Sequence, residues 1–199
     1  AASEISGLVI MNDIKDGKYI NVENRVIEGN IVLNYSETEV PQNNGLTRCT
    51  IRSPLFFKDC HFKGSIKGFV ESISGPSKSM NFEQTLCFIN CTFDEEVDLR
   101  AAVFHGVLTF QDCIFMKDVN LTESNFTQGV CLANSTFEQF LGMQNCKTLV
   151  RFDASQIKCY GGFSCQGCVF YSDVIFNNAS FEKTSEFSLC LFDQGLFLN

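Results

Sequence analysis

The chain has 199 residues, of which 45% are hydrophobic and 19% charged, so it carries enough apolar side chain for a packed core and is unlike a disordered chain. Its formal net charge of −8 argues against direct binding to nucleic acid, because such a surface must be basic to neutralise phosphates. No run of about 18 apolar residues occurs, so the sequence predicts no membrane-spanning helix.

Residues 3–16 are the one segment that predicts a helix, with Ser3 as its N-cap and Gly17 as its end. Its apolar stripe consists of Ile5, Leu8, Val9 and Ile14. Such a helix would cover the open end of a following repeat domain. Docking on a membrane or a partner is the alternative, which the lack of a basic face disfavours. We therefore expect a helical cap over residues 1–20 and a repeat domain over residues 21–199.

The register of the repeat begins upstream of its regular part. Cys60-His61-Phe62 with Ile66 fits it, and so do segments around residues 26–33 and 49–57. Two polar stretches interrupt this register, near residues 34–47 and 69–78. Both are expected to be loops that leave the coil and return.

From residue 79 to the end, large apolar residues recur every eleven positions in two interleaved series. A small or apolar residue stands two positions before nearly every one of them, and this spacing puts both on one face of an extended segment. Each unit therefore contributes two short extended stretches that point inward. The predicted core consists of Phe82, Phe88, Phe93, Leu99, Phe104, Phe110, Phe115, Leu121, Phe126, Leu132, Phe137, Met143, Phe152, Phe163, Phe170, Phe176, Phe181, Phe187 and Phe192.

The pattern changes once, over two successive units. Thr148 and Cys159 replace the expected Phe, while Phe152 and Phe163 fill the neighbouring Val position. Exchange of large and small residues is what a shared, close-packed interior tolerates. The exchange also indicates that two units, or 22 residues, make one physical turn.

Strings such as NCTFDEEVDL, DCIFMKDVNL and ESNFTQGVCL resemble the pentapeptide-repeat family, in a Phe-rich branch that alternates spacings of five and six. The resemblance covers roughly residues 48–199 and, more loosely, 20–34. It implies an all-β fold, a right-handed quadrilateral parallel β-helix with four short faces per turn. It also implies one possible activity, because some members protect DNA gyrase by imitating duplex DNA.

Catalytic and metal chemistry have little support in the sequence. His61 and His105 should both point outward, and neither is linked to a Ser or Cys nucleophile. The 11 cysteines fall mostly at core positions, and the C-x-x-C of Cys165 and Cys168 has no second half for a zinc site. We expect inert buried thiols, no metal, no cofactor and no enzymatic activity. Unpaired thiols suit a reducing cytosol, while a preceding signal peptide would place the chain outside it.

The acidic residues are unevenly distributed. Residues 1–78 have a net charge of zero and residues 79–199 a net charge of −8. A cluster of four should face solvent as a possible interaction surface, and a pair of carboxylates could also serve a polysaccharide-cleaving enzyme. The cluster consists of Asp94, Glu95, Glu96 and Asp98.

Four hypotheses about function follow. The first is a rigid, non-enzymatic scaffold that binds another protein, and the second is a DNA mimic that binds gyrase. The third is an accessory or extracytoplasmic domain of a larger membrane protein, because residues 195–199 show no cap. A second copy of the chain meeting that end would also cover it, which predicts a homodimer. A carbohydrate-active enzyme comes last.

Overall fold

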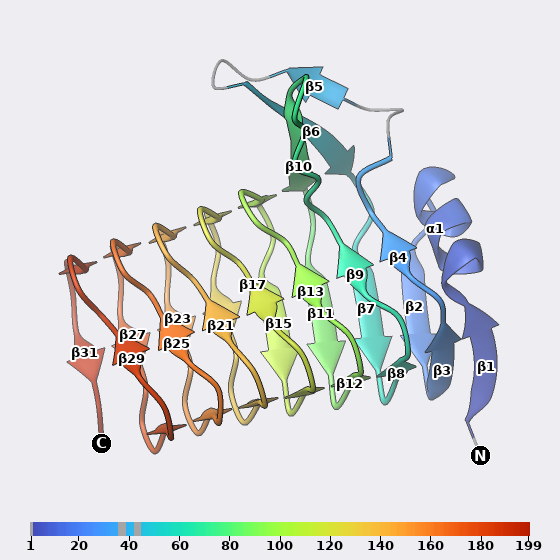
Figure 1. Ribbon diagram of the computed structural model, residues 1–199. Helices are drawn as coiled ribbons and strands as arrows, with labels where there is room; N and C mark the ends of the chain where they lie inside the picture. The colour runs from blue at the N-terminus through green and yellow to red at the C-terminus, as the bar shows by residue number, and fades with distance from the viewer. Residues whose placement is uncertain (1, 36–38, 42–44) are drawn as a thin grey trace.

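The computed structural model describes residues 2–35, 39–41 and 45–199, and the chain winds into a parallel β-helix with four faces (Figure 1). Each face is one sheet, named A to D. Sheet A contains β1 (Ser3–Ser6), β3 (Arg25–Glu28), β8 (His61–Phe62), β12 (Thr92–Phe93), β16 (Ile114–Phe115), β20 (Thr136–Phe137), β24 (Lys158–Cys159) and β28 (Ser180–Phe181). Sheet B contains β2 (Ile20–Glu23), β7 (Leu55–Lys58), β11 (Leu86–Ile89), β15 (Leu108–Gln111), β19 (Val130–Cys131), β23 (Phe152–Asp153), β27 (Val174–Ile175) and β31 (Leu196–Phe197).

The other two faces complete each coil. Sheet C contains β4 (Ile31–Val32), β9 (Ile66–Lys67), β13 (Val97–Asp98), β17 (Val119–Asn120), β21 (Leu141–Gly142), β25 (Phe163–Ser164) and β29 (Ser185–Glu186). Sheet D contains β5 (Glu39–Pro41), β6 (Leu46–Ile51), β10 (Ser77–Phe82), β14 (Val103–Phe104), β18 (Asn125–Phe126), β22 (Lys147–Thr148), β26 (Val169–Phe170) and β30 (Leu191–Phe192).

The predicted turn of 22 residues is confirmed by the register of the sheets. Phe93 pairs with Phe115, and Phe115 pairs with Phe137. Upstream the offset grows: Phe62 pairs with Phe93, 31 residues on, and Ile27 pairs with Phe62, 35 residues on. The chain therefore leaves the coil twice, first for thirteen and then for nine residues more than a regular turn.

These two excursions form a β-structured projection at one corner of the coil, at the top of Figure 1. β5 runs antiparallel to β6, and β6 pairs with all six residues of β10. Val70 and Lys78 form a further antiparallel bridge. Parts of both segments expected to be loops are therefore extended strands; the expectation for residues 36–38 and 42–44 lies outside the described residues.

The N-terminal helix α1 (Gly7–Lys15) is shorter than expected. Its N-cap is Ser6, whose hydroxyl accepts a hydrogen bond from the Leu8 amide, so the prediction of Ser3 was wrong. Ser3 instead belongs to β1, which pairs with β3 in the 22-residue register, and this pairing removes residues 3–6 from the helix.

The buried face of α1 also differs from the predicted stripe. Leu8 and Val9 are exposed, whereas Ile10 and Ile14, one helical turn apart, are buried. Ile14 lies with Ile31, Leu33 and other core residues around a small internal hollow. The helix therefore covers the first coil of the core, at the N-terminal end in Figure 1.

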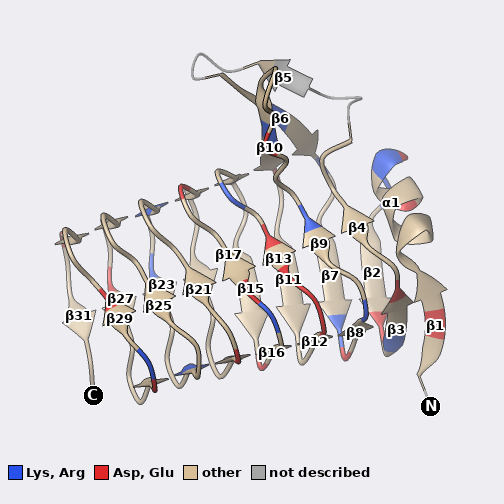
Figure 2. Ribbon diagram, viewed as in Figure 1, with Lys and Arg blue, Asp and Glu red and all other residues tan. Residues whose placement is uncertain are grey.

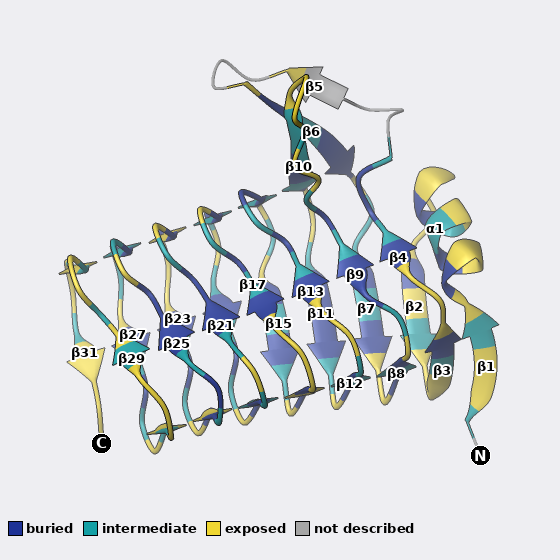
Figure 3. Ribbon diagram, viewed as in Figure 1, coloured by how far each residue is buried: buried dark blue, intermediate teal, exposed yellow. Residues whose placement is uncertain are grey.

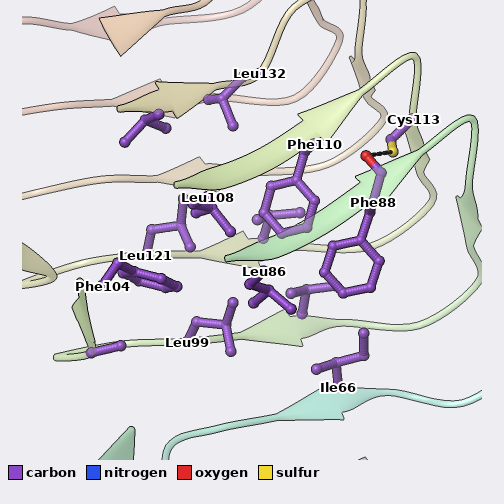
Figure 4. Close-up of a cluster of buried hydrophobic side chains, with 14 of the residues drawn as sticks. Ile66, Leu86, Phe88, Leu99, Phe104, Leu108, Phe110, Cys113, Leu121 and Leu132 are labelled. Carbon is purple, nitrogen blue, oxygen red and sulfur yellow. Dashed lines mark hydrogen bonds between the residues drawn. The ribbon is translucent and has the colours of Figure 1, made fainter. Parts of the chain in front are cut away.

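The interior is a set of phenylalanine columns. In sheet A, Phe93 stacks on Phe115 at 4.6 Å between ring centroids, and Phe115 on Phe137 at 4.9 Å. The neighbouring column of sheet B meets it edge-on, with Phe110 at 5.1 Å from Phe115. Both arrangements are favourable for aromatic rings. Figure 3 shows the buried strands as a continuous band along the coil, and Figure 4 shows side chains of successive coils above one another.

One corner of every unit has a left-handed backbone. From residue 90 onward, a positive φ recurs every eleven positions, at Asn90, Ala101, Asp112, Glu123, Asn134, Asn145, Gln156, Gly167, Asn178 and Leu189. Asn, Asp and Gly tolerate this conformation, and other residues are strained in it by about 1–2 kcal/mol. The corner therefore explains the recurring Asn of this sequence.

Replacing Leu189 by Asn should stabilise the protein. Leu189 has φ of 58° and is 84% exposed, so it gains no burial that would offset the strain. We expect the free energy of unfolding to rise by about 1 kcal/mol, measured by urea denaturation. Asn178→Leu, at the same corner of the preceding unit, should show the opposite sign; a loss of stability in Leu189→Asn would contradict the explanation.

Candidate functional site

The structure places most of the predicted core residues inside the coil. All those from Phe82 to Phe176 are buried, including Phe152 and Phe163, which fill the space left beside Thr148 and Cys159. Phe181, Phe187 and Phe192, in the last coils, are half-buried and pack against the same core. These residues pack against one another and do not line a ligand site, so candidate binding groups are the outward side chains.

The four acidic residues reach solvent, with Glu95 and Glu96 exposed and Asp94 and Asp98 partly buried, and three of them have basic partners. Asp94 accepts hydrogen bonds from Lys63 Nζ at 2.8 Å and pairs with His61 Nε2 at 2.7 Å. Lys67 Nζ lies 3.4 Å from a carboxylate oxygen of Glu96. These bases stand 29–33 residues before their acidic partners, because the nine-residue excursion shifts the offset of this coil from 22 to 31.

The other two residues of the cluster differ, because Asp98 has a basic partner and Glu95 is exposed. Asp98 makes a bidentate pair with Arg100, at 2.8 Å from Nη2 and 3.0 Å from Nε. Figure 2 shows acidic and basic segments side by side on the coils around β9, β12 and β13. The cluster is therefore largely an ion-pair network between neighbouring coils.

Both histidines lie on the outside of the coil, and His61 pairs with Asp94. Partial burial raises the pKa of the Asp94 carboxyl, but hydrogen bonds from Lys63 and His61 outweigh it and hold that pKa below its ordinary value. His61 thereby bridges one coil to the next. His105 is exposed on the turn after Phe104.

The small residue two positions before each large one has a definite task. The side chains of Ser124, Ser135, Cys146, Cys168 and Cys190 each donate to the carbonyl 25 positions earlier, at 2.8–3.0 Å. Cys113 makes the same contact to Phe88 at 3.5 Å, the dashed line in Figure 4. A buried carbonyl at the corner is thereby satisfied. The cysteines are thus weak hydrogen-bond donors in a structural position.

Ser135→Ala should cost about 1–3 kcal/mol of unfolding free energy. The Ser135 hydroxyl donates to the Phe110 carbonyl at 2.8 Å and accepts from the Cys113 amide at 3.1 Å, so its loss leaves two buried backbone groups without this partner. Ser135→Cys is the matched control and should lose less, because Cys fills the same position elsewhere. Equal losses in thermal and urea denaturation would contradict this role.

The buried thiols of Cys91 and Cys159 stay protonated near neutral pH. Desolvation raises the pKa of Cys159 to about 12, and a hydrogen bond with Cys113 together with burial raises that of Cys91 to about 12. Cys165 and Cys190 have Sγ atoms 3.6 Å apart, with no disulfide between them. Among the described residues, no three His, Cys, Asp or Glu side chains are grouped as metal ligands would be.

An exposed apolar cluster on sheet D was not predicted. It consists of Leu149, Val150, Tyr171 and Leu191, each 41–55% exposed, and we call it the sheet D patch. These residues lie on successive coils, since the Tyr171 amide donates to Thr148 and the Leu191 amide to Cys168. Part of the signal was present: Leu149 and Tyr171 occupy the position just after the inward residue, where the earlier coils have His105 and Thr127.

The outer end of the last coil is also apolar. Leu196, Phe197 and Leu198 are all exposed, at 40–66%. Figure 3 shows β31 as exposed, in contrast to the buried strands of the same sheet. Within the described residues, no helix is both long and apolar enough to cross a membrane.

Stacked coils of this kind, with side chains filling the interior, define a β-solenoid repeat protein. Residues 78–125 and 88–136 match the family model described as pentapeptide repeats in nine copies. The matched part of the chain, residues 78–136, thus carries pentapeptide repeats. Among curated proteins and among solved structures, the comparisons find no match.

Proposed function

We propose that this protein is a non-enzymatic scaffold that holds a partner protein against sheet D of a rigid coil. The continuous buried core supports the rigidity, because successive coils are joined by backbone hydrogen bonds and by stacked rings. The family supports it as well, since pentapeptide-repeat proteins commonly mediate protein interactions. The scaffold needs no cavity, because a flat face suffices for a protein partner.

The sheet D patch is the observation that carries this proposal. A contiguous exposed apolar surface marks an interaction site more often than isolated apolar residues do. Covering Leu149, Val150 and Leu191 would contribute roughly 1–3 kcal/mol each. Tyr171 adds an aromatic anchor, and Lys147 Nζ lies 5.2 Å from its ring centroid, which fixes a positive charge at the edge of the patch.

The test is a pair of matched variants. Leu149→Lys/Leu191→Lys changes the patch, and Ser180→Lys/Ser188→Lys adds the same charge at two exposed positions away from it, on sheet A and on the turn after β29. Proteins cross-linked to the wild type in an extract of the native host are identified, and the purified partner is titrated against all three forms. We expect affinity to fall by at least ~10-fold for the patch variant alone. No partner, or equal losses in both variants, rejects the proposal.

The DNA-mimic alternative has weaker support. Imitation of duplex DNA needs an extended acidic surface that can enter a basic groove. Here Asp94 and Glu96 lie beside Lys63 and Lys67 of the preceding coil, and Asp98 lies beside Arg100 of its own coil. A gyrase supercoiling assay distinguishes the two functions, and we expect no inhibition at micromolar protein.

We also propose that the exposed end of the last coil supports self-association of this chain. Leu196, Phe197 and Leu198 would be covered by the equivalent face of a second copy, as would the free strand edge of β31. Sedimentation equilibrium tests this: Phe197→Lys/Leu198→Lys should shift a dimer toward monomer. A wild-type chain that is still monomeric at about 100 μM contradicts the proposal.

A further inference from the structure

We propose that the free edge of β2, at the N-terminal end of sheet B, binds an extended peptide segment of a partner protein as an added parallel strand. This inference rests on the proposed scaffold function and names a second surface and the chemistry of what it takes. The site lies between β1 and α1, at the opposite end of the coil from the sheet D patch (Figure 1).

The edge of β2 has no strand beside it among the described residues. Sheet A continues one strand further, because β1 pairs with β3, whereas sheet B ends at β2. The amides of Ile20 and Asn24 donate to Pro54 and Lys58, on the β7 side. In a parallel ladder, alternate residues direct their backbone groups to opposite sides, so those of Asn21 and Glu23 face away from β7. They form the template for another strand.

A hollow of about 260 Å³ lies along this edge. Its walls come from Ile5 of β1, Ile10 and Asp13 of α1, and residues 19–23. The inward side of β2 offers Ile20, which is buried, and Val22, which is half-buried; Asn21 and Glu23 are exposed on the outer side. An entering strand would therefore meet the partly exposed Val22, polar groups that include Asp13 and Arg25, and backbone groups that pair with no other described strand.

The neighbouring β1 shows how a segment binds in this position. It lies parallel to β3, with Ile5 opposite Ile27 and Ser3 opposite Arg25. The Ser3 hydroxyl also accepts a hydrogen bond from the Arg25 guanidinium. A single short strand thus docks on the first coil through backbone pairing, one inward apolar residue and one outward polar contact.

The same rules define the occupant of the β2 edge. Its inward residues must be apolar, to lie over Ile20 and Val22. Its outward residue opposite Glu23 should be basic, since β7 places Lys58 opposite Glu23 on the other side. The expected partner segment therefore reads apolar-x-apolar-basic, which is the pattern of Leu55-Phe56-Phe57-Lys58 in β7 itself.

The test uses a fluorescein-labelled peptide with the sequence of residues 53–59 and a scrambled peptide of the same composition. Anisotropy titration against the full chain should show saturable binding of the first peptide only. Asn21→Pro removes one of the two amides that face the free edge and leaves the bonds to β7 in place, so it should weaken binding about 10-fold or more. Circular dichroism and thermal denaturation check that this variant folds.

A charge exchange provides a second test that does not alter the backbone. Glu23→Lys should weaken binding of the peptide, and a Lys-to-Glu change at the matching peptide position should restore it. Equal binding of the scrambled peptide, no effect of Asn21→Pro in a folded protein, or no rescue by charge exchange would overturn the proposal. So would a dimer of this chain that is broken by Asn21→Pro, because a second copy would then be the occupant. The sheet D variants should bind the peptide normally, so the two proposals can fail separately.

Discussion

Phe115→Ala is expected to lower the free energy of unfolding by about 3–5 kcal/mol. Phe115 is fully buried, stacks on Phe93 and Phe137, and meets Phe110 edge-on. Alanine would leave a ring-sized cavity in the middle of a column. The coils above and below are fixed by their own backbone hydrogen bonds, so they cannot collapse into it. Urea denaturation measures the loss.

Lys117→Ala is the matched control, two residues further along the same coil. Lys117 is exposed, so its truncation should change stability by less than about 0.5 kcal/mol. Equal losses for the two variants would contradict the inward and outward assignment of the whole repeat.

Raising the pH from 8 to 11 is expected to destabilise the protein strongly, in the presence of a reductant. An unfolded thiol has a pKa of about 8.5, whereas Cys159 and Cys91 have a pKa of about 12 in the folded state. Below pH 8.5 both states are protonated and these thiols give no pH dependence. Between about pH 9 and pH 12 only the unfolded state loses protons, so stability falls as the pH rises. Each thiol contributes up to roughly a tenfold change in the unfolding equilibrium constant per pH unit.

Cys159→Ala separates this effect from the titration of Tyr and Lys. The variant is less stable at pH 8, because it loses buried volume, but its stability should fall less steeply between pH 9 and pH 11. Urea unfolding at four pH values gives the two slopes. Identical slopes would show that Cys159 ionises as readily in the folded protein as in the unfolded chain.

The sequence reveals the repeating part of the fold because each core residue is selected by the same surroundings. Phe93, Phe115 and Phe137 recur every 22 positions since each one stacks on the last. The exchange at Phe152 and Phe163 is equally visible, because a fixed volume must be filled.

Features outside the periodic register could not be found in the same way. The start of α1 was misplaced because Ser3 satisfies the local rules of an N-cap, while a strand pair with Arg25, 22 residues away, decides its structure. The partners Lys63 and Lys67 of the acidic cluster were hidden by the nine-residue excursion. The sheet D patch was missed because the spacing of the core residues does not tell how exposed each outward side chain is.

The stacking of the coils also determines how the molecule opens. Along the described part of the coil, backbone hydrogen bonds join each coil to the coils before and after it, and the last coil has half-buried rings where the middle has fully buried ones. Such a chain behaves as a linear array of coupled units. Unzipping should therefore start at the C-terminal coil, and amide protons should exchange fastest there, with protection rising step by step toward the centre of the column.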